Sequence, residues 1–560
     1  MKRAKSIHIG LCAMPNMPQS VQGEIVTLAN EKYYKISNYD LMPAFFMSIT
    51  SNSDLWMFIS SNGALTAGRC SPDNALFPYY TDDRIHDSQE NTGSKTIIFV
   101  RRDDKTFLWE PFSRNYWGVY RIERNIYKNI VGNQLIFEEI NHDLGVNFQY
   151  AWLNCDRFGL IKKARIKNTN PESVHINFID GIQNILPAGV DRRLQLEFST
   201  LVDGYKKNEL LADTGIALYT LSSIITDRAE PNESLKGTTV WSVGLDKPVI
   251  LLSTTQLELF RSGQVLEQET EIHGKRGAYF LSSELEMPAS TENEWFIVAD
   301  VDRDQSDVVA LSRWLTSGTD VKQLLEEEIS KSSDMLKQKI ASADGYQTTG
   351  DSLTNFRHCS NTLFNIMRGG IFDDGYSIKV TDLQSFISNA NKSLIKKHDK
   401  ILRNLPDPIH LEELRERISS VDPDLERLCF EYLPLTFSRR HGDPSRPWNH
   451  FSIDVLDDDG NKKLNYEGNW RDIFQNWEAL ALSFPEFIEN MITKFVNACT
   501  ADGYNPYRVT RDGFDWEVPS PSEAWANIGY WGDHQIIYLS KLLELSVDYH
   551  PGKLVDLLTK

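Results

Sequence analysis

The sequence predicts a β + α multidomain protein, and three observations support this fold class. Residues 1–300 contain many short runs rich in Ile, Val, Phe, Tyr and Trp, separated by Gly, Asn, Asp and Pro, which is typical of strands joined by turns. Residues 301–350 change to a helical period with abundant Glu and Lys. Residues 351–560 contain helix-like segments joined by long polar loops. We therefore expect a β domain, a helical linker and a helical domain, in that order.

The strand-rich region is predicted to form a β-sandwich over residues 1–300. Runs such as KTIIFV, QLIFEEI, VNFQYAWL and EWFIVADV follow one another without helical segments between them, as in sandwiches and barrels. Residues 61–83 are polar and rich in glycine, so we expect a loop there. Loops of about twenty residues usually serve a function.

The helical region contains two helices whose patterns predict different surroundings. Residues 470–483 are helix-like, and Pro485 stands where proline is tolerated, in the first turn of the next helix. That helix repeats apolar residues such as Phe487, Met491 and Phe495 along one face, which predicts an outer helix. The segment IIYLSKLLEL, which follows Asp533, is apolar almost all round, which predicts a buried inner helix.

Composition excludes several classes of function. The chain has 560 residues and a net charge of 59 − 78 = −19, so it lacks the basic surface that nucleic acid requires. No run approaches the roughly eighteen apolar residues of a membrane span. The six cysteines show no CxxC spacing, which predicts no zinc or other metal site and no disulfide framework, and favours a reducing cytoplasm.

An aromatic and polar stretch between residues 469 and 538 indicates a carbohydrate site. Six of the thirteen tryptophans lie in or just before it, among acids, arginines and amides. Sugar rings present apolar faces that stack on indoles and hydroxyls that hydrogen-bond to such polar groups. The predicted substrate-binding residues of this stretch are Trp470, Arg471, Asp472, Trp477, Glu478, Arg511, Asp515, Trp516, Glu517, Trp531, His534 and Gln535, and Trp448 and Trp525 complete the set of tryptophans.

A second polar segment, between residues 435 and 451, contains the densest group of charges in the helical half. Arg439, Arg440 and His441 are followed by Asp443 and Arg446. These side chains would bind phosphate or sugar hydroxyls, or they would form a lid held together by its own salt bridges. We favour the first interpretation.

The order of domains and the segment GYWGDHQIIYL resemble inverting glycoside phosphorylases of the cellobiose and chitobiose phosphorylase kind, glycoside hydrolase family 94. The resemblance implies a galactose mutarotase-like β super-sandwich, a helical linker and an (α/α)6 barrel whose loops form the active site. It also implies Asp533 as the general acid, inorganic phosphate as co-substrate and no other cofactor. The chain departs from the family at Gly532, where the family has an aspartate, and it has no counterpart of the later Asp-Trp-Asn-Asp-Gly segment.

The chemistry leaves alternatives open. If water replaces phosphate as the nucleophile, a second carboxylate must stand about 6.5–9.5 Å from the acid, and Asp515, Glu517, Asp472 and Glu478 are candidates. Asp533 also stands where an N-cap aspartate would, and Arg471, Asp472 and Glu478 would serve equally as surface charges of a helix. A carbohydrate-binding protein without catalytic activity is the third interpretation.

The length of the helical half predicts an incomplete barrel. Only 210 residues follow Gly350, whereas twelve helices of about 11–12 residues with long loops need well over 300. We therefore expect residues 351–560 to be the first part of a longer barrel, less firmly packed than the sandwich. The resembling family also suggests a homodimer in which the sandwich helps to close the site, and this resemblance implies Arg69 of the 61–83 loop as a candidate substrate-binding residue.

Overall fold

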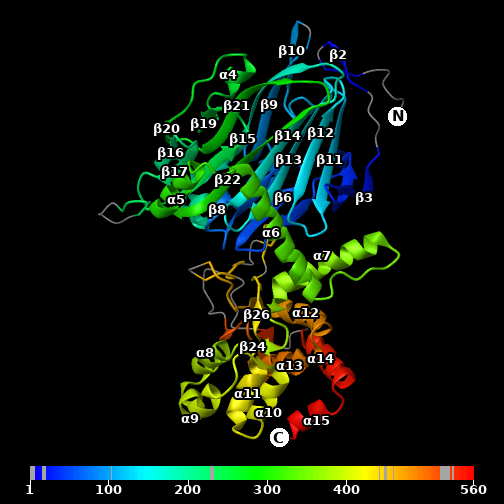
Figure 1. Cartoon of the computed structure of the whole chain (residues 1–560), viewed down its shortest axis with the longest axis vertical. Coiled ribbons are helices and arrows are strands. Elements are labelled where there is room, and N and C mark those ends of the chain that lie inside the picture. The colour runs from blue at the N-terminus through cyan, green and yellow to red at the C-terminus, as the bar shows by residue number, and fades with distance from the viewer. Residues whose placement is uncertain are drawn as a thin grey trace. The chain divides into compact units, whose positions relative to one another are not determined.

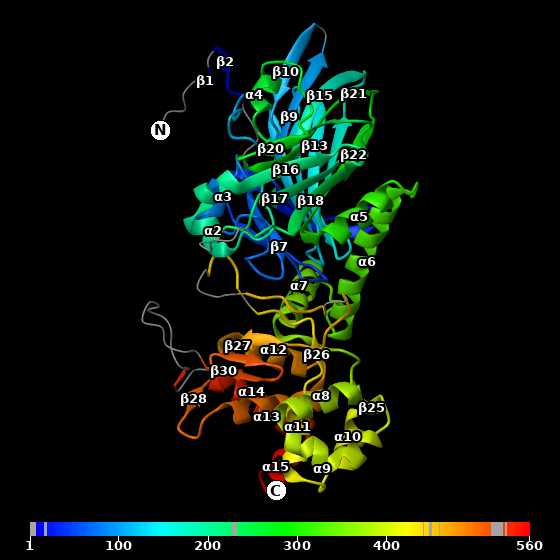
Figure 2. The ribbon, with the colours of Figure 1, turned by 90° about the vertical axis from the view of Figure 1, so that its left-hand side faces the viewer.

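The computed structural model describes residues 7–9, 11–15, 20–102, 104–226, 232–440, 442–446, 451–457, 460–516, 530–531 and 535–559. The chain divides into two compact units. The first, which we call the sandwich unit, comprises Met1–Leu336 with Asp443–Pro447; the second, the helical unit, comprises Lys337–Gly442 with Trp448–Lys560. Strands fill the sandwich unit and helices dominate the helical unit, as Figure 1 and Figure 2 show.

The sandwich unit is built on an antiparallel sheet of eleven strands. Strand β13 shows why its sequence VNFQYAWLNC is apolar on both faces: Phe148 and Trp152 enter the core between the sheets, while Leu153 and Cys155 enter a second core outside. In spatial order the strands are β20 (Glu271–His273), β16 (Lys206–Leu211), β17 (Ile216–Leu221), β18 (Lys236–Val243), β22 (Glu292–Asp304), β14 (Gly159–Asn168), β13 (Val146–Cys155), β12 (Leu135–Asn141), β11 (Ile122–Asn129), β4 (Glu31–Ser37) and β3 (Gln22–Leu28).

A five-stranded antiparallel sheet packs against the first and closes the main core. The rings of Phe178 on this sheet and Trp295 on the large one stack with their centroids 4.7 Å apart. The predicted β-sandwich is therefore present. The five strands, in spatial order, are β10 (Lys105–Trp109), β9 (Gly93–Arg102), β15 (Val174–Ile185), β21 (Gly277–Met287) and β19 (Val249–Leu251).

Residues 61–83, which we predicted to be a loop, contain two strands of a four-stranded sheet. Leu65 and Phe77 lie in the main core and are fully buried. The prediction was wrong because Gly68 and the polar neighbours conceal the apolar positions: a Cβ on Gly68 would lie 2.1 Å from the backbone oxygen of Asn74, so only glycine allows this strand pairing. The sheet consists of β5 (Phe46–Ile49), β6 (Leu55–Ser60), β7 (Leu65–Arg69) and β8 (Ala75–Phe77).

Two helices follow the last strand of the sandwich in the region predicted to be a helical linker. They are α5 (Gln305–Leu315) and α6 (Val321–Ser342). Trp314 of α5 stacks on Phe158, and Leu325 and Ile329 of α6 join the outer core of the large sheet. The remaining short elements of this unit are β1 (His8–Ile9), β2 (Cys12–Ala13), η1 (Tyr39–Leu41), α1 (Asp82–Asp87), α2 (Arg192–Glu197), α3 (Ser199–Tyr205) and α4 (Leu257–Arg261).

In the helical unit, α7 and α14 pack on α12, and α14 also packs on α13. Gly369 at the end of α7 allows a close approach, because a Cβ there would lie 2.9 Å from the Cβ of Asn476 on α12. No described helix is long and apolar enough to span a membrane. The helices of this set are α7 (Ser352–Gly369), α12 (Trp470–Ala481), the 3-10 turn η2 (Pro485–Phe487), α13 (Ile488–Ala498), α14 (Ile536–Tyr549) and α15 (Lys553–Leu558).

Between α7 and α12 the chain forms a separate helical lobe. Its neck is a strand pair in which Ile371 faces Thr436 and Phe372 faces Leu435. Within the lobe, the side chain of Asp422 accepts hydrogen bonds from the first turn of its helix, and Pro423 occupies that turn, as expected for a helix start. Its elements are β23 (Ile371–Phe372), β24 (Ser377–Ile378), α8 (Val380–Ala390), α9 (Lys392–Arg403), β25 (Ile409–His410), α10 (Leu411–Ile418), α11 (Pro423–Glu431) and β26 (Leu435–Thr436).

Helices α13 and α14 reverse the predicted order of burial. In α13, the polar side chains of Glu489, Asn490 and Lys494 are buried along with the apolar ones, so it is not an outer helix. In α14, Ile536 and Ile537 are each 55% exposed. The sequence prediction was wrong because the buried polar groups of α13 have partners, as when Asn490 donates to the carbonyl of Tyr432 at 2.9 Å, and pairing makes their burial tolerable.

Candidate functional site

A small sheet at the start of α12 brings together polar residues that are far apart in the sequence. Strand β27 (Glu467–Asn469) pairs with β29 (Arg508–Thr510), which pairs with β30 (Gly513–Asp515). The amide of Trp470, the first residue of α12, donates to the carbonyl of Tyr507 at 2.9 Å. Gly468 is required here because a Cβ would lie 2.9 Å from the Cβ of Ile473. The sheet therefore fixes the segments 467–472 and 507–515 next to each other.

Arg508 joins two carboxylates across this sheet. Its Nη1 lies 3.0 Å from Oε2 of Glu467, and its Nε lies 2.7 Å from Oδ2 of Asp515. The hydroxyl of Ser452 donates to the other oxygen of Glu467. Glu467 is largely shielded from solvent, whereas the side chain of Asp515 is half exposed. Each carboxylate has more acceptor sites than these bonds use, so Asp515 retains the capacity to bind hydroxyl groups of a ligand.

Arg440 adds a second guanidinium on the same sheet. Its Nε donates to Oδ1 of Asn469 at 3.2 Å, and its guanidinium lies 5.8 Å from the ring centroid of Tyr507. The amide of Asn469 donates in turn to Asp472 at 3.4 Å. We call Arg440, Glu467, Asn469, Asp472, Arg508 and Asp515 the arginine–carboxylate cluster. It unites three residues named from the sequence, Arg440, Asp472 and Asp515, with three that were not.

The three residues that the sequence analysis missed had a detectable signal. RVTRDGFD contains an Asp-Gly pair between short apolar-containing runs, which is a strong hairpin signal. In the structure the turn residues are Arg511 and Asp512, one position earlier than this signal indicates, and Arg508 faces Asp515. Pairing of the hairpin with Glu467 and Asn469 has no local signal, because it joins residues about forty positions apart.

Trp470 and Trp477 are not available as stacking surfaces for sugars, contrary to prediction. Both side chains are 0% exposed. Trp470 packs on Phe474 and Phe495 with centroid distances of 4.8 and 4.7 Å, and Nε1 of Trp477 donates to the carbonyl of Gly369 at 2.8 Å. These tryptophans form the core between helices. Trp516, which is 36% exposed and follows Asp515 directly, remains an aromatic candidate at the cluster.

The other predicted residues on α12 and α14 lie apart from the cluster contacts. Glu478 forms an ion pair with Lys541 of α14 at 3.5 Å. Arg471 is exposed in the first turn of α12, and Gln535 is buried where α14 begins. Glu478 therefore connects two helices and is not placed as a catalytic base by any contact in the described chain.

Arg511 connects the hairpin to the helical lobe. Its Nη2 lies 2.8 Å from Oδ1 of Asp382, whose second oxygen accepts from the hydroxyl of Tyr432 at 2.7 Å. The carbonyl of Arg511 accepts from the buried Nζ of Lys494 at 3.2 Å. Burial lowers the pKa of Lys494 to about 8. Arg511 thus has an observed role in holding the fold together.

The charged segment around Arg439 does not form one cluster in the helical unit. Arg439 is buried, with its guanidinium 5.0 Å from the ring centroid of Phe437. Arg440 belongs to the arginine–carboxylate cluster, as described above. Residues 443–447 are grouped with the sandwich unit, in which the carbonyl of Pro444 accepts from the amide of Asp82. Binding of phosphate or sugar hydroxyls by Arg439, Arg440 and His441 stays a prediction.

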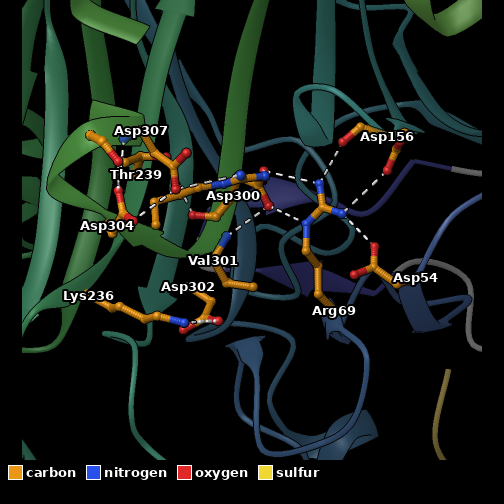
Figure 3. Close-up of polar contacts among 12 residues, drawn as sticks. Asp54, Arg69, Asp156, Lys236, Thr239, Asp300, Val301, Asp302, Asp304 and Asp307 are labelled. Carbon is orange, nitrogen blue, oxygen red and sulfur yellow. Dashed lines mark hydrogen bonds and ion pairs between the residues drawn. The ribbon is translucent and has the colours of Figure 1, made fainter. Parts of the chain in front are cut away.

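Arg69 is enclosed in an ion network and is not free to bind a substrate, contrary to prediction. Its Nε lies 2.7 Å from Asp300, Nη1 lies 2.5 Å from Asp54, and Nη2 donates to the carbonyl of Asp156 at 2.7 Å, as Figure 3 shows. Burial alone would raise the pKa of Asp300, but the guanidinium groups of Arg69 and Arg303 outweigh it and lower that pKa. Arg69 fastens β7 to β22 and is structural.

Several predicted residues lie outside the described residues. They include Asp533, the acid implied by the resemblance, so the structure does not test its role. For Trp531 the backbone is described: it faces Tyr504 in the pairing of β31 (Tyr530–Trp531) with β28 (Tyr504–Asn505). The other residues outside the described part are Glu517, His534, His441, Trp448 and Trp525.

Comparisons with known proteins bear on the helical lobe and on the fold. Residues 372–434 match a family model described as glycoside hydrolase family 149 insertion domain 1. The matched segment starts within β23 and ends just before β26, so it coincides with the lobe above its neck. No curated protein matches the chain.

Among solved structures, the chain is similar to a bacterial glucoamylase complexed with acarbose, with 11% identity, 85% of this chain and 62% of that chain covered, and a TM-score of 0.35. It is also similar to a kojibiose phosphorylase described from the human microbiome, with 10% identity and a TM-score of 0.22; the match covers 84% of this chain and 46% of that chain. A third similar structure is a family GH92 α-mannosidase from Bacteroides thetaiotaomicron, with 9% identity and a TM-score of 0.24; the match covers 71% of this chain and 55% of that chain. The chain thus spans less than two thirds of the length of each. The lobe of residues 372–434 resembles a domain of carbohydrate-active glycoside hydrolases.

Proposed function

We propose that this chain is part of a carbohydrate-active protein of the glycoside phosphorylase type, with its substrate site at the arginine–carboxylate cluster. The observation that carries the proposal is the arrangement of Arg508 between Glu467 and Asp515, beside the partly exposed Trp516. Carboxylates, guanidinium groups and an indole are the groups that bind sugar hydroxyls and ring faces. The match of residues 372–434 to a glycoside hydrolase insertion domain supports the same class.

In the proposed reaction, phosphate cleaves a β-linked di- or oligosaccharide with inversion. Asp533 donates a proton to the glycosidic oxygen while a phosphate oxygen bonds to the anomeric carbon from the opposite face. The bond between that carbon and the glycosidic oxygen breaks, which gives a sugar 1-phosphate and a shortened saccharide with a free hydroxyl. Arg440 and Arg508 are placed to bind the phosphate dianion or the sugar hydroxyls beside it. Phosphate needs no general base, so one acid suffices.

Hydrolysis is the second candidate, because Asp515 is a half-exposed carboxylate within the cluster. An inverting hydrolase needs such a group to activate water. Asp515 already accepts from Nε of Arg508, but its remaining lone pairs are free for a water molecule. The product then carries a free anomeric hydroxyl in place of a phosphate.

The test is product analysis of the protein with β-linked gluco-oligosaccharides in the presence and absence of inorganic phosphate. Phosphate-dependent release of sugar 1-phosphate supports the proposal, and release of reducing sugar without phosphate supports hydrolysis. Asp533→Asn should abolish turnover while saccharide binding, followed by calorimetry, stays nearly unchanged. If more than a few per cent of turnover survives, Asp533 is not the acid.

A variant pair tests the cluster itself. Arg508→Met should lower kcat/KM or saccharide affinity by about tenfold or more, since it removes two charge-assisted bonds. Arg403→Met is the matched control, because Arg403 is exposed on α9 and, among the described residues, pairs only with Asp399 one turn away. Saccharide binding without turnover in any condition would indicate a carbohydrate-binding protein. An equal loss in both arginine variants would argue against the cluster as the site.

A further inference from the structure

The sandwich unit contains a cavity of about 410 Å³ that the proposed function does not use. This volume lies within the range of roughly 300–1,000 Å³ that is usual for small-molecule sites. The cavity combines aromatic and polar side chains from the turn after β4, the ends of β6 and α1, and the segment between β10 and β11. The residues used in the following argument are Tyr39, Asp40, Gln89, Phe112, Trp117 and Arg124.

Arg124 provides a fixed cation at this cavity. It is buried; its Nε lies 2.7 Å from Glu139, and its Nη2 donates to the carbonyl of Ser113 at 3.1 Å. Glu139 is held in turn by Nε1 of Trp109 at 2.8 Å. These bonds use Nε and Nη2, and no hydrogen bond of Nη1 is present among the described residues. A guanidinium held in this way loses little side-chain entropy when its remaining nitrogen binds a ligand.

The cavity wall carries backbone strain and an unsatisfied acceptor. Phe112 has a φ of +64°, which is rarely adopted by a bulky residue and is often found at ligand sites. Two bonds hold it there: its amide donates to Glu139 at 2.6 Å, and its carbonyl accepts from Nε2 of Gln89 at 2.9 Å. The oxygen of the Gln89 amide is buried and has no hydrogen-bond partner among the described residues. A ligand hydroxyl would supply the missing donor.

The chemistry of the lining indicates the class of ligand. Asp40 and the amide oxygen of Gln89 can accept hydrogen bonds from a ligand, and Arg124 can donate them. Trp117 presents a side chain that is 61% exposed. Desolvation raises the pKa of Asp40, and the positive charge of Arg124 offsets part of this rise. The lining carries two arginines, Arg114 and Arg124, beside one acid, Asp40. Donors, acceptors and an indole together suit a polyhydroxylated ring.

We propose that this cavity is a second saccharide-binding site, which takes a sugar residue and stacks it on Trp117. It is formed entirely by the sandwich unit, so the proposal holds whether or not the arginine–carboxylate cluster is catalytic. A site of this kind would hold a saccharide chain on the protein without cleaving it.

The experiment uses the whole chain labelled with 5-fluorotryptophan and followed by fluorine NMR. The resonance that disappears in Trp117→Phe identifies Trp117. Titration with glucose, cellobiose and laminaribiose should shift this resonance with saturation for at least one probe. Trp117→Ala and Gln89→Leu should each weaken that binding about tenfold, as measured by calorimetry with the same probe.

Matched controls separate this site from the cluster. Trp516→Ala removes an exposed tryptophan of the helical unit and should leave the Trp117 titration unchanged. The proposal is overturned if no probe shifts the Trp117 resonance, or if Trp117→Ala and Gln89→Leu leave the affinity unchanged. Loss of turnover in Arg508→Met with intact Trp117 binding would concern the proposed function alone.

Discussion

The sandwich and helical units differ in the group that binds a buried lysine. Between the two sheets, Nζ of Lys162 lies 2.5 Å from Asp180, with both side chains 0% exposed. Asp180 also accepts from Thr96 at 2.7 Å and from Nε1 of Trp295 at 2.8 Å. In the helical unit the buried Nζ of Lys494 instead donates to the carbonyl of Arg511 at 3.2 Å. Both units also have aromatic cores, such as Phe178 with Trp295 in the sandwich unit and Trp470 with Phe474 and Phe495 in the helical unit.

This difference shows why residue type alone did not locate a site. Buried charges such as Arg69 and large aromatics such as Trp470 are the residues that binding sites use, but here both units bury such residues in their own cores. At the arginine–carboxylate cluster and at the Trp117 cavity, by contrast, Asp515 and Trp117 are at least half exposed. Exposure depends on tertiary packing and so is not visible in a single segment.

The largest expected effect tests the charged core of the sandwich. Asp180→Ala leaves the buried ammonium of Lys162 without its partner and should lower the free energy of unfolding by about 3–5 kcal/mol, as measured by urea denaturation. In the double variant Lys162→Met, Asp180→Leu no charge remains buried, and most of the loss should be recovered. If the single variant is as stable as the parent protein, the pair is not the anchor that its burial indicates.

The next prediction concerns the aromatic core of the helical unit. Trp470→Ala should destabilise this unit by about 3–5 kcal/mol, because it opens a cavity at a fully buried position. Trp516→Ala, at a partly exposed position, should change stability by less than about 0.5 kcal/mol while weakening saccharide binding at the cluster. Limited proteolysis of each variant would show which unit opens. Equal losses of stability in the two variants would contradict the distinction between a core tryptophan, Trp470, and a partly exposed one, Trp516.

A pH dependence of stability is expected from the buried Lys494 of the helical unit. Burial lowers the pKa of Lys494 from 10.5 to about 8, so between these values the unfolded chain binds more protons than the folded one. Stability therefore rises with pH in this window, and the penalty is fully present below pH 8. The advantage of Lys494→Met over the parent protein should shrink by about 3 kcal/mol between pH 7 and pH 10.5. Lys541→Met, at a half-exposed site, should show no such trend.

The smallest effect is expected at the surface of the helical lobe. Arg403 and Asp399 form an exposed pair one turn apart on α9, 2.8 Å from Nε to Oδ1. Asp399→Ala should cost no more than about 0.5 kcal/mol, and less at high salt. A larger loss in thermal denaturation would mean that the pair is shielded by a partner surface.

Local patterns were sufficient for the elements that depend on neighbouring residues. The helix predicted over 470–483 is α12 at Trp470–Ala481, and the helix predicted after Pro485 is η2 with α13. The strands of the sandwich were also predictable, because the alternation of apolar and polar residues and the β-branched residues lie within one strand. The prediction of a loop over residues 61–83 was wrong because the apolar positions there are few and are separated by glycine and polar residues.

The sequence by itself determined the class of fold and the kind of chemistry available. It contained the order of strands and helices, the carboxylates and arginines of residues 467–515, and the acidic net charge. Only the tertiary structure decided which of these residues are used by the fold and which face a ligand. The physical reason is that burial and pairing arise between distant segments: Arg508 meets Glu467 across 41 positions, as 508 − 467 shows, and Arg69 meets Asp300 across 231. No local pattern records such contacts.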